Sequence, residues 1–287
     1  MSFIYTVDVE DWYQVENLRP SFPRDTWLNC ESRVEDAVQR LLELCAEKEV
    51  KGTFFILGWI AKRHPQLVKA IAAGGHEVAC HGFNHDMLTV MNEAAIRRDI
   101  AAAKPLLEDS CGVSVTGFRA PNFSITNPAL DILADLGFEY DSSLFPFARH
   151  DRYGKIDTSR FERLGANIYR YKDNGLLEFV LPIRRIRRVD LPWAGGGYFR
   201  LLPIRVYCGG VRAILAQNET FIFYMHTWEI DPGQPHVKTV RAAARFRHYV
   251  GLKGAYRKLE HLLGQFGGST RLTDLAHRVR LSSPANG

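Results

Sequence analysis

The sequence lacks any long hydrophobic run, because polar residues interrupt every stretch well before about 18 apolar residues accumulate. We therefore expect no transmembrane helix. A secretory leader is also missing from the sequence, since a strand-like apolar stretch already begins at Phe3 with no basic segment before it. These two absences predict a cytoplasmic protein.

Cysteine is scarce and scattered. The five cysteines are Cys30, Cys45, Cys80, Cys111 and Cys208, and no two of them form a C-x-x-C pair. This usage is typical of a reduced protein whose cysteines are small buried apolar residues. The sequence also contains no internal repeat and no low-complexity linker, which favours one domain with an insertion and a helical tail.

The charge balance is mildly basic. The 37 Lys and Arg against 32 Asp and Glu give a net charge of +5. Part of this excess lies in one segment, IRRIRR, which contains Arg184, Arg185, Arg187 and Arg188. Two interpretations stay open for this segment: a solvated face, or contact with an anionic polymer or a membrane surface. Nothing in the sequence indicates binding to nucleic acid.

Short apolar runs alternate with helical patterns through the first half of the chain. The predicted strands and helices follow in turn as 3–7, 32–50, 52–58, 65–75, 76–82, 92–112, 115–121 and 127–137. This alternation predicts an α/β fold with a parallel sheet or barrel and helices outside it.

The alternation breaks after about residue 145. We expect an irregular insertion over residues 146–215, because Arg, Gly and Pro are frequent there. The run 220–226 predicts another buried strand. From residue 236 to 287 the chain is basic and helical in pattern, and we expect this extension to pack on the barrel.

Polar residues that could take part in catalysis or bind a metal follow the predicted strands. In parallel α/β folds, active sites gather where the carboxyl ends of the strands meet. The residues at these ends are Asp8, Glu10, Asp11, His81, His85, Arg119 and His226.

The spacing of two histidines suggests a metal site. His81 and His85 are four residues apart, so on a helical turn both would face one ion. Alternatively, such histidines cap helices or make core hydrogen bonds. The carboxylates at 8–11 repel one another unless a cation or Arg119 compensates them, or unless they form an exposed acidic turn that caps a helix near Trp12.

Five segments occur in order over residues 6–235: TVDVED, HGFNH, FRAPNF, YDSSLFP and FYMHTWEIDPGQP. Together they resemble the motifs of the polysaccharide deacetylases of carbohydrate esterase family four, the nodulation-type deacetylase homology group. The segments DVEDW, GGGYFRLLP and WEIDPGQP are similar to a subgroup from exopolysaccharide loci linked to exosortase systems.

The resemblance implies a distorted (β/α) barrel over residues 1–235 and a divalent metal, usually zinc, held by one aspartate and two histidines. By position in the motifs, it implies that Asp8 is the general base and that Arg119 orients it. His81 and His85 correspond to metal ligands, and His226 corresponds to the general acid.

The chain departs from the family at its first motif. Where the family has two adjacent aspartates, this chain has Asp8-Val9-Glu10-Asp11. The third metal ligand is therefore Glu10 or Asp11. Strand alternation puts Asp8 and Glu10 on one side, which favours Glu10, but Asp11 is equally able if the strand has already ended.

Residues that could contact a substrate are Asn122, Phe123, Asp141, Tyr198 and Trp228. A backbone N–H near Asn122 or Phe123 could hold an oxyanion, and Trp228 or Phe123 could stack a sugar ring or pack in the core. Asp141 could brace the pocket or bind substrate. Asp231 could orient His226 or form a turn.

The resemblance implies metal-dependent hydrolysis of N-acetyl groups on amino sugars of a bacterial exopolysaccharide or its lipid-linked precursor. On the cytoplasmic side, the protein could also contact the inner membrane peripherally. Two alternatives are an allantoinase-like or other C–N hydrolase, and an inactive barrel that binds glycan.

Overall fold

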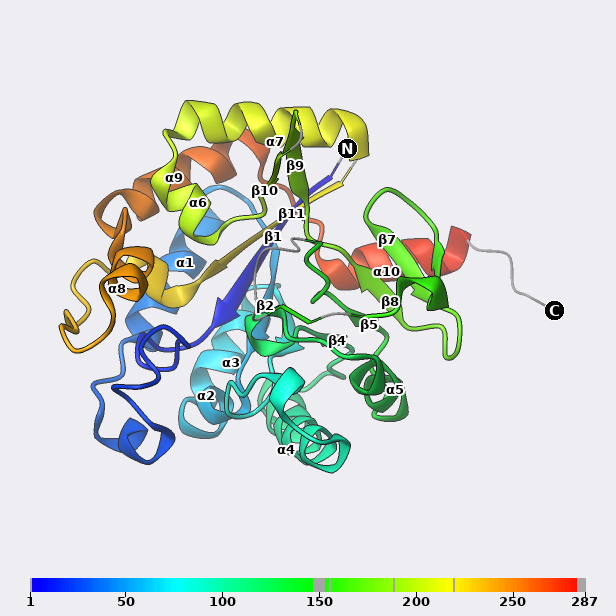
Figure 1. Ribbon diagram of the computed structural model, residues 1–287, viewed down its shortest axis with the longest axis horizontal. Helices are drawn as coiled ribbons and strands as arrows, with labels where there is room; N and C mark the ends of the chain where they lie inside the picture. Colours follow the sequence, from blue (N-terminus) through cyan, green and yellow to red (C-terminus); the bar gives the residue numbers. More distant parts are fainter. Residues whose placement is uncertain (1, 147–152, 155, 188, 219, 283–287) are drawn as a thin grey trace.

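The computed structural model describes residues 2–146, 153–154, 156–187, 189–218 and 220–282 of the 287-residue chain (Figure 1). Among these residues, no helix combines the length and the apolar composition needed to cross a membrane.

A curled sheet runs through the centre of the molecule, with helices around it (Figure 1). In the described part of the chain it has nine strands in the order β11-β1-β2-β3-β4-β5-β8-β7-β6, and all pairs from β11 to β8 are parallel. The prediction of an α/β fold with a distorted barrel of parallel strands is confirmed. The strands are β1 Ser2–Val9, β2 Gly52–Ile56, β3 Glu77–Cys80, β4 Gly117–Phe118, β5 Tyr140–Asp141, β6 Phe161–Arg163, β7 Ile168–Tyr171, β8 Leu177–Phe179, β9 Ile183–Ile186, β10 Val189–Pro192 and β11 Thr220–His226.

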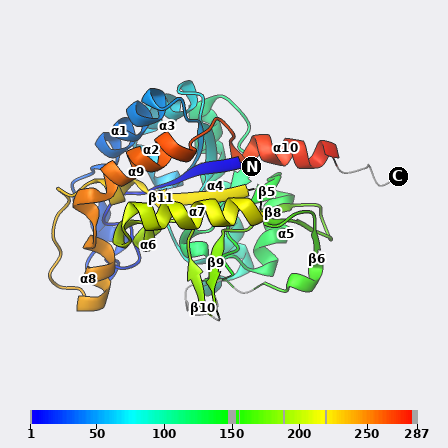
Figure 2. The same ribbon diagram turned by 90° about the horizontal axis from the view of Figure 1, so that it is seen from above.

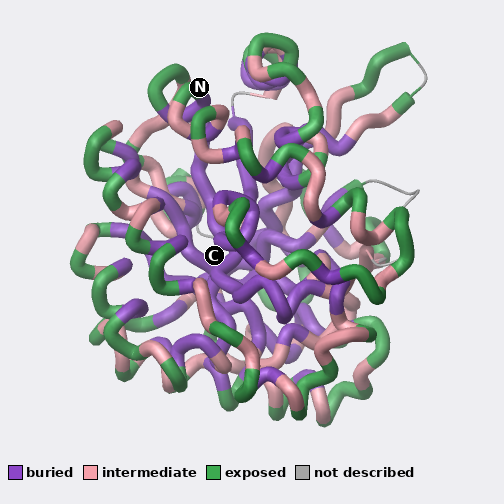
Figure 3. Tube along the Cα trace, turned by 90° about the vertical axis from the view of Figure 1, so that its left-hand side faces the viewer, coloured by how far each residue is buried: buried purple, intermediate pink, exposed green. Residues whose placement is uncertain are grey.

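Helices cover the outside of the sheet, so the strands form the buried centre of the molecule (Figure 3). The helices are α1 Val34–Glu47, α2 Gly58–Arg63, α3 Pro65–Ala73, α4 Glu93–Cys111, α5 Asn127–Asp135, α6 Gly196–Leu201, α7 Ile204–Asn218, α8 Ala242–Tyr249, α9 Leu252–Phe266 and α10 Leu272–Ser282.

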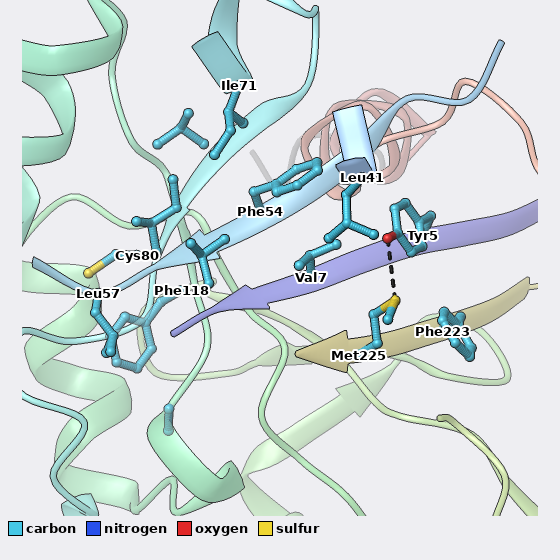
Figure 4. Packing of buried hydrophobic residues seen from close by; sticks show 14 of the residues in the cluster. Tyr5, Val7, Leu41, Phe54, Leu57, Ile71, Cys80, Phe118, Phe223 and Met225 are labelled. Carbon is cyan, nitrogen blue, oxygen red and sulfur yellow. Dashed lines mark hydrogen bonds between the residues drawn. The ribbon is translucent and has the colours of Figure 1, made fainter. Parts of the chain in front are cut away.

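Strand β1 divides the interior into two layers by simple alternation. Tyr5 and Val7 face the helices and pack with Leu41 of α1 and Phe54 of β2, where the Tyr5 hydroxyl also donates to Met225 Sδ at 3.4 Å (Figure 4). The residues between them point into the barrel. Because this inner row continues towards the carboxyl end of β1, it carries Asp8 into the barrel interior, where Asp8 is 2% exposed.

The segment 146–215 is less irregular than the sequence predicts. Its described residues contain strands β6 to β10, helix α6 and most of α7. Strands β7 and β6 extend the sheet by antiparallel pairing, and β9 and β10 form a separate hairpin. These strands are three or four residues long, which is too short to produce a recognisable alternation of apolar and polar residues.

The C-terminal extension lies against the barrel at two places. Helix α9 packs beside α6 and α7, and its Leu259 and Leu262 join the main core. Helix α10 places Leu272 and Ala276 against Ile4 of β1 and the neighbouring strands. The barrel end opposite the carboxyl ends of the strands is thereby closed by α10.

Candidate active site

The carboxyl ends of strands β11, β1, β3 and β4 bring the predicted polar residues together. Strands β11, β1, β2, β3 and β4 are adjacent in the sheet. Asp8 of β1 pairs in register with His226, the last residue of β11. His81 follows β3, and its imidazole lies next to the main chain of Arg119 beyond β4.

Glu10, His81 and His85 form a buried cluster. Each offers one ligand atom, and these atoms all lie within 4.8 Å of one another. Glu10 Oε2 and His85 Nε2 are 2.8 Å apart, yet within the described residues Glu10 Oε2 has no partner in hydrogen-bond geometry. A buried carboxylate oxygen that faces two imidazoles in this way fits a divalent cation, since two nitrogens and one carboxylate are a common zinc donor set.

The hydrogen bonds of His81 fix its tautomer. Its Nδ1 lies 2.8 Å from the carbonyl oxygen of Arg119, and a carbonyl oxygen can only accept, so Nδ1 donates and Nε2 keeps its lone pair. Burial lowers the pKa of His81 to about 4, partly opposed by Asp8. His81 is therefore neutral at physiological pH, as a metal ligand must be.

The segment from His81 to His85 is a loop, and the helical turn that the four-residue spacing suggested is absent from it. Gly82 has φ +73° and His85 has φ +58°. The loop is held by Asp99, which accepts from the Phe83 N–H at 2.7 Å, and by the Gly82 carbonyl, which accepts from the Gly58 N–H. Both imidazoles reach Glu10 through this loop geometry.

Asp11 lies outside the cluster. Its carboxylate accepts from the Ser32 hydroxyl at 2.6 Å and from the N–H groups of Trp12 and Arg33. Burial raises the pKa of Asp11, although these hydrogen bonds oppose the shift. Asp11 thus binds the chain just before α1. Since Asp8, Glu10 and Asp11 are all buried, the alternative of an exposed acidic turn is wrong. Of the two candidate ligands, the geometry favours Glu10.

Asp8 is bound by Arg119. The Arg119 guanidinium is completely buried, and its Nη1 donates to Asp8 Oδ1 and to the Thr6 hydroxyl, both at 2.8 Å. Its Nε donates to the carbonyl oxygen of Ser142 at 2.9 Å. Because both Nε and Nη1 of its guanidinium are hydrogen-bonded, Arg119 holds the Asp8 carboxylate in one orientation beside the Glu10 cluster.

His226 is oriented by Glu229, which the sequence alone did not single out. Its Nδ1 donates to Glu229 Oε1 at 2.6 Å, and its Nε2 lies 3.8 Å from Asp8 Oδ2 and 3.6 Å from Glu10 Oε1. Burial lowers the pKa of His226, but Glu10 and Glu229 outweigh burial and raise it to about 9. These two carboxylates therefore favour the protonated form of the imidazole.

Glu229 is itself held by Arg200. Arg200 Nε donates to Glu229 Oε2 at 3.1 Å, while its other nitrogens donate to the carbonyl oxygens of Arg247, His248 and Val250. Asp231, which was one candidate for orienting His226, instead accepts from Arg33. The signal that could have identified Glu229 is its spacing, because a turn after the strand brings residue 229 back to residue 226.

A cavity of about 430 Å³ opens in front of these groups. Its lining includes Asn122, Phe123 and Tyr198, all predicted to contact substrate. Asn122 and Phe123 have φ +53° and +56°. The Phe123 N–H already donates to the carbonyl of Ala120, whereas the buried Asn122 Nδ2 has no hydrogen-bond partner among the described residues.

Trp228 lies at the cavity but is 5% exposed. Its indole N–H donates to Glu10 Oε1 at 3.0 Å. The rings of His226 and His248 stack against the indole, with centroids 5.2 and 4.3 Å away, and the Arg200 guanidinium lies over it. Of the two roles predicted for Trp228, these contacts favour packing within the site over stacking on a sugar ring.

Asp141 is completely buried and does not belong to the cavity lining. It accepts from the Ser143 hydroxyl at 2.6 Å, and the Ser143 oxygen accepts from the Ala120 N–H at 2.7 Å. Burial raises the pKa of Asp141 to about 6. Of its two predicted roles, bracing the pocket agrees with these contacts and direct substrate binding does not.

Two family models match the chain. The one described as polysaccharide deacetylase matches residues 23–140, and a domain of unknown function, DUF3473, matches residues 142–274. The first match contains His81, His85 and Arg119, and the second contains His226 and Glu229.

Several curated proteins are similar to parts of the chain. It is 40% identical over 72 residues to a chitooligosaccharide deacetylase of Rhizobium leguminosarum bv. trifolii, over 25% of this chain and 34% of that protein. It is 30% identical over 132 residues to a peptidoglycan deacetylase of Helicobacter pylori, over 44% of this chain and 45% of that protein. The chain therefore spans less than half the length of these relatives.

Solved structures share the fold over nearly the whole chain. A Mycobacterium smegmatis structure assigned to the polysaccharide deacetylases has a TM-score of 0.65 at 20% identity, over 98% of this chain and 90% of that one. Puue allantoinase has a TM-score of 0.60 at 17% identity, over 99% and 92%. At these identities the likeness shows the fold alone.

Proposed function

Because the chain belongs to the polysaccharide deacetylase family, we propose that it hydrolyses N-acetyl groups on amino sugars of a bacterial exopolysaccharide or of its lipid-linked precursor. The proposal is supported by the buried Glu10, His81 and His85 cluster, by the Asp8–Arg119 ion pair, and by a cavity whose lining includes Asp8, Glu10, His85 and His226. The relatives whose names include chitooligosaccharide and peptidoglycan deacetylase support an acetylated amino sugar as the substrate class.

Glu10, His81 and His85 are the proposed metal ligands. A divalent cation held there, for which we propose zinc, would supply Lewis-acid chemistry to the acetyl carbonyl. The Trp228 N–H and the Arg119 carbonyl each hold one of these ligands in orientation. Such supporting contacts fix the tautomer and direction of ligands and strengthen binding.

Asp8 is the proposed general base. Its carboxylate takes a proton from the water that attacks the acetyl carbon. The bond to Arg119 at 2.8 Å keeps one oxygen occupied, so that the other, Oδ2, is directed towards the side of the site where His226 lies.

His226 is the proposed general acid, which gives a proton to the departing amine. The Glu229 carboxylate accepts from its Nδ1–H and raises its pKa, which favours the protonated imidazole. The Asn122 side-chain amide, buried at the cavity without a partner among the described residues, is available to donate to the acetyl oxygen or a sugar hydroxyl.

The proposal is tested by measuring acetate release from acetylated amino-sugar oligomers together with the metal content of the purified protein. Asp8→Asn should reduce release by a factor of about 10² to 10⁴ while the metal content stays unchanged. Glu10→Gln should reduce both. Absence of acetate with every divalent ion, or turnover of allantoin instead, would contradict the proposal. Loss of metal in Asp8→Asn would show that base and ligand are exchanged.

A further inference from the structure

Two basic protrusions with exposed apolar residues flank the cavity. One is the β9–β10 hairpin, whose last residue Pro192 lines the cavity, and the other is α8, which contributes Phe246 to the lining. Both project from the same side of the molecule (Figure 2). We call the exposed residues of these two protrusions, together with Leu201 of α6, the mouth face.

The hairpin presents an apolar pair to solvent. Strands β9 and β10 pair with each other and form a sheet separate from the main one. Ile186 and Val189 are directly opposite in the register, so their side chains lie on one side of the hairpin, and each is 42% exposed. Apolar side chains near the end of a two-stranded hairpin contribute little to a core, which indicates a role outside the fold.

Arginines surround this apolar pair. Arg185 makes an ion pair with Asp190, and the Arg184 guanidinium lies over the Trp193 ring at 5.0 Å. Arg187 is exposed beyond the end of β9. The fourth arginine of the IRRIRR segment, Arg188, lies outside the described residues. The side chains of Arg184 and Arg187 thus add positive charge next to Ile186 and Val189.

The opposite side of the cavity also combines exposed apolar side chains with basic residues. Phe246 is 60% exposed and Leu201 is 53% exposed. The sequence from residue 232 to 259, which includes α8, contains no Asp or Glu. Its basic residues up to the end of α8 are Lys238, Arg241, Arg245 and Arg247.

We propose that the mouth face docks on an anionic lipid bilayer. Basic residues are attracted to the negative surface of such a bilayer, and exposed Ile, Val, Leu and Phe side chains enter the boundary between headgroups and acyl chains. An anionic polysaccharide would satisfy the arginines but would give Ile186 and Val189 no apolar environment. The exposed apolar residues therefore favour a membrane over a polymer.

Docking in this way turns the cavity towards the bilayer surface. A sugar attached to a lipid carrier would then meet Asp8 and His226 without leaving the membrane. This last step rests on the proposed deacetylation, whereas the docking itself does not.

The test is co-sedimentation of the full chain with phosphatidylcholine vesicles that contain or lack phosphatidylglycerol. We expect binding to the anionic vesicles only, and release by salt. Arg187→Ser should weaken binding about fivefold, as expected for one surface arginine. The double variant Ile186→Ser/Val189→Ser should also weaken it about fivefold or more.

Matched controls lie elsewhere on the surface. Val90 and Val113 flank α4, away from the mouth face, and are 75% and 60% exposed. The variant Val90→Ser/Val113→Ser therefore alters apolar side chains that are more exposed than Ile186 and Val189. Arg278→Ser on α10 is the control for charge. These controls should bind vesicles like the unaltered chain.

Three outcomes would overturn the proposal: no vesicle binding, equal loss in the controls, or binding of an anionic polysaccharide that the two hairpin variants weaken while vesicles are not bound. Acetate release from a soluble acetylated oligosaccharide, measured on the same samples, separates the two hypotheses. The hairpin variants should keep that activity, so its absence in every sample would count against the proposed function alone.

Discussion

Individual residues in the site depend on a small number of fixed partners. His226 contacts Glu229, Glu229 contacts Arg200, and Arg200 contacts three backbone carbonyls of the C-terminal segment. Because every one of these atoms is buried or partly buried, a change at one position alters the orientation and the charge of the next.

We predict that Glu229→Gln lowers acetate release about tenfold or more, because the acid would lose its orienting carboxylate. Glu229 helps to raise the pKa of His226 to about 9. The protonated form is the active acid, so activity is lost as pH rises through this pKa. The variant should lose activity at a lower pH. The pH dependence of kcat/KM measures this shift.

The control is Asp231→Asn, since Asp231 contacts Arg33 rather than His226. If kcat/KM of Glu229→Gln fell at the same high pH as in the unaltered chain, the assigned role of Glu229 would be contradicted. An equal shift of this pH in both variants would contradict it as well.

His76 gives a prediction about stability. It accepts from the Gly52 N–H at 3.1 Å through Nδ1, and burial, followed by Lys51, lowers its pKa from 6.5 to about 4. The unfolded chain therefore binds a proton more readily between pH 6.5 and 4. The contribution of His76, at most about 3 kcal/mol, is complete above pH 6.5 and is lost as pH falls towards 4.

Urea unfolding of the unaltered chain and of His76→Asn should show a stability difference that shrinks as pH falls over this range. The exposed His277→Asn is the matched control and should show no such trend. A difference that is constant with pH would contradict the prediction.

At the scale of elements, the junction between α8 and α9 connects the C-terminal helices to the site. Gly251 has φ +74°, and a Cβ there would lie 2.5 Å from the carbonyl oxygen of Arg200. The junction needs glycine both for its backbone conformation and for this close approach.

We predict that Gly251→Ala destabilises the protein by about 1–3 kcal/mol and lowers kcat more than it raises KM, because Arg200 would shift and carry Glu229 with it. Gly254 is the matched control, because it lies inside α9 and a Cβ added there would meet no atom within 4 Å. Gly254→Ala should be neutral or stabilise the helix by up to about 1 kcal/mol. Thermal unfolding and steady-state kinetics on both variants test this pair, and equal effects would contradict it.

At the scale of the whole molecule, the boundary between the two family matches falls inside one sheet. Strand β5 before the boundary pairs with β8 after it, and β1 pairs with β11 along seven residues. The proposed metal ligands come from the first half and the proposed acid from the second, so each half lacks part of the core and part of the site.

We predict that residues 1–141 and 142–287, expressed separately, do not fold. Each fragment would expose strand edges and apolar faces that the other half covers in the intact chain. Circular dichroism and denaturant unfolding should show no cooperative transition in either fragment, with the intact chain as control. A cooperative transition in one fragment would contradict the prediction and would mark that half as an independent domain.

The sequence by itself determined the α/β class and the residues at the strand ends. The apolar run of β1 and the helical periodicity of α1 and α4 are local properties, so they are visible along the chain. The pairing of Asp8, His81, Arg119 and His226 at one edge also follows from the parallel order of the strands.

Only the tertiary structure decided how these residues are used. It favours Glu10 in the cluster and puts Asp11 at the start of α1, because the chain turns directly after β1. It shows that Glu229, and not Asp231, lies beside His226, because a short turn directs residue 229 back to the strand end. These choices depend on contacts between segments distant in sequence, and no local pattern along the chain encodes such contacts.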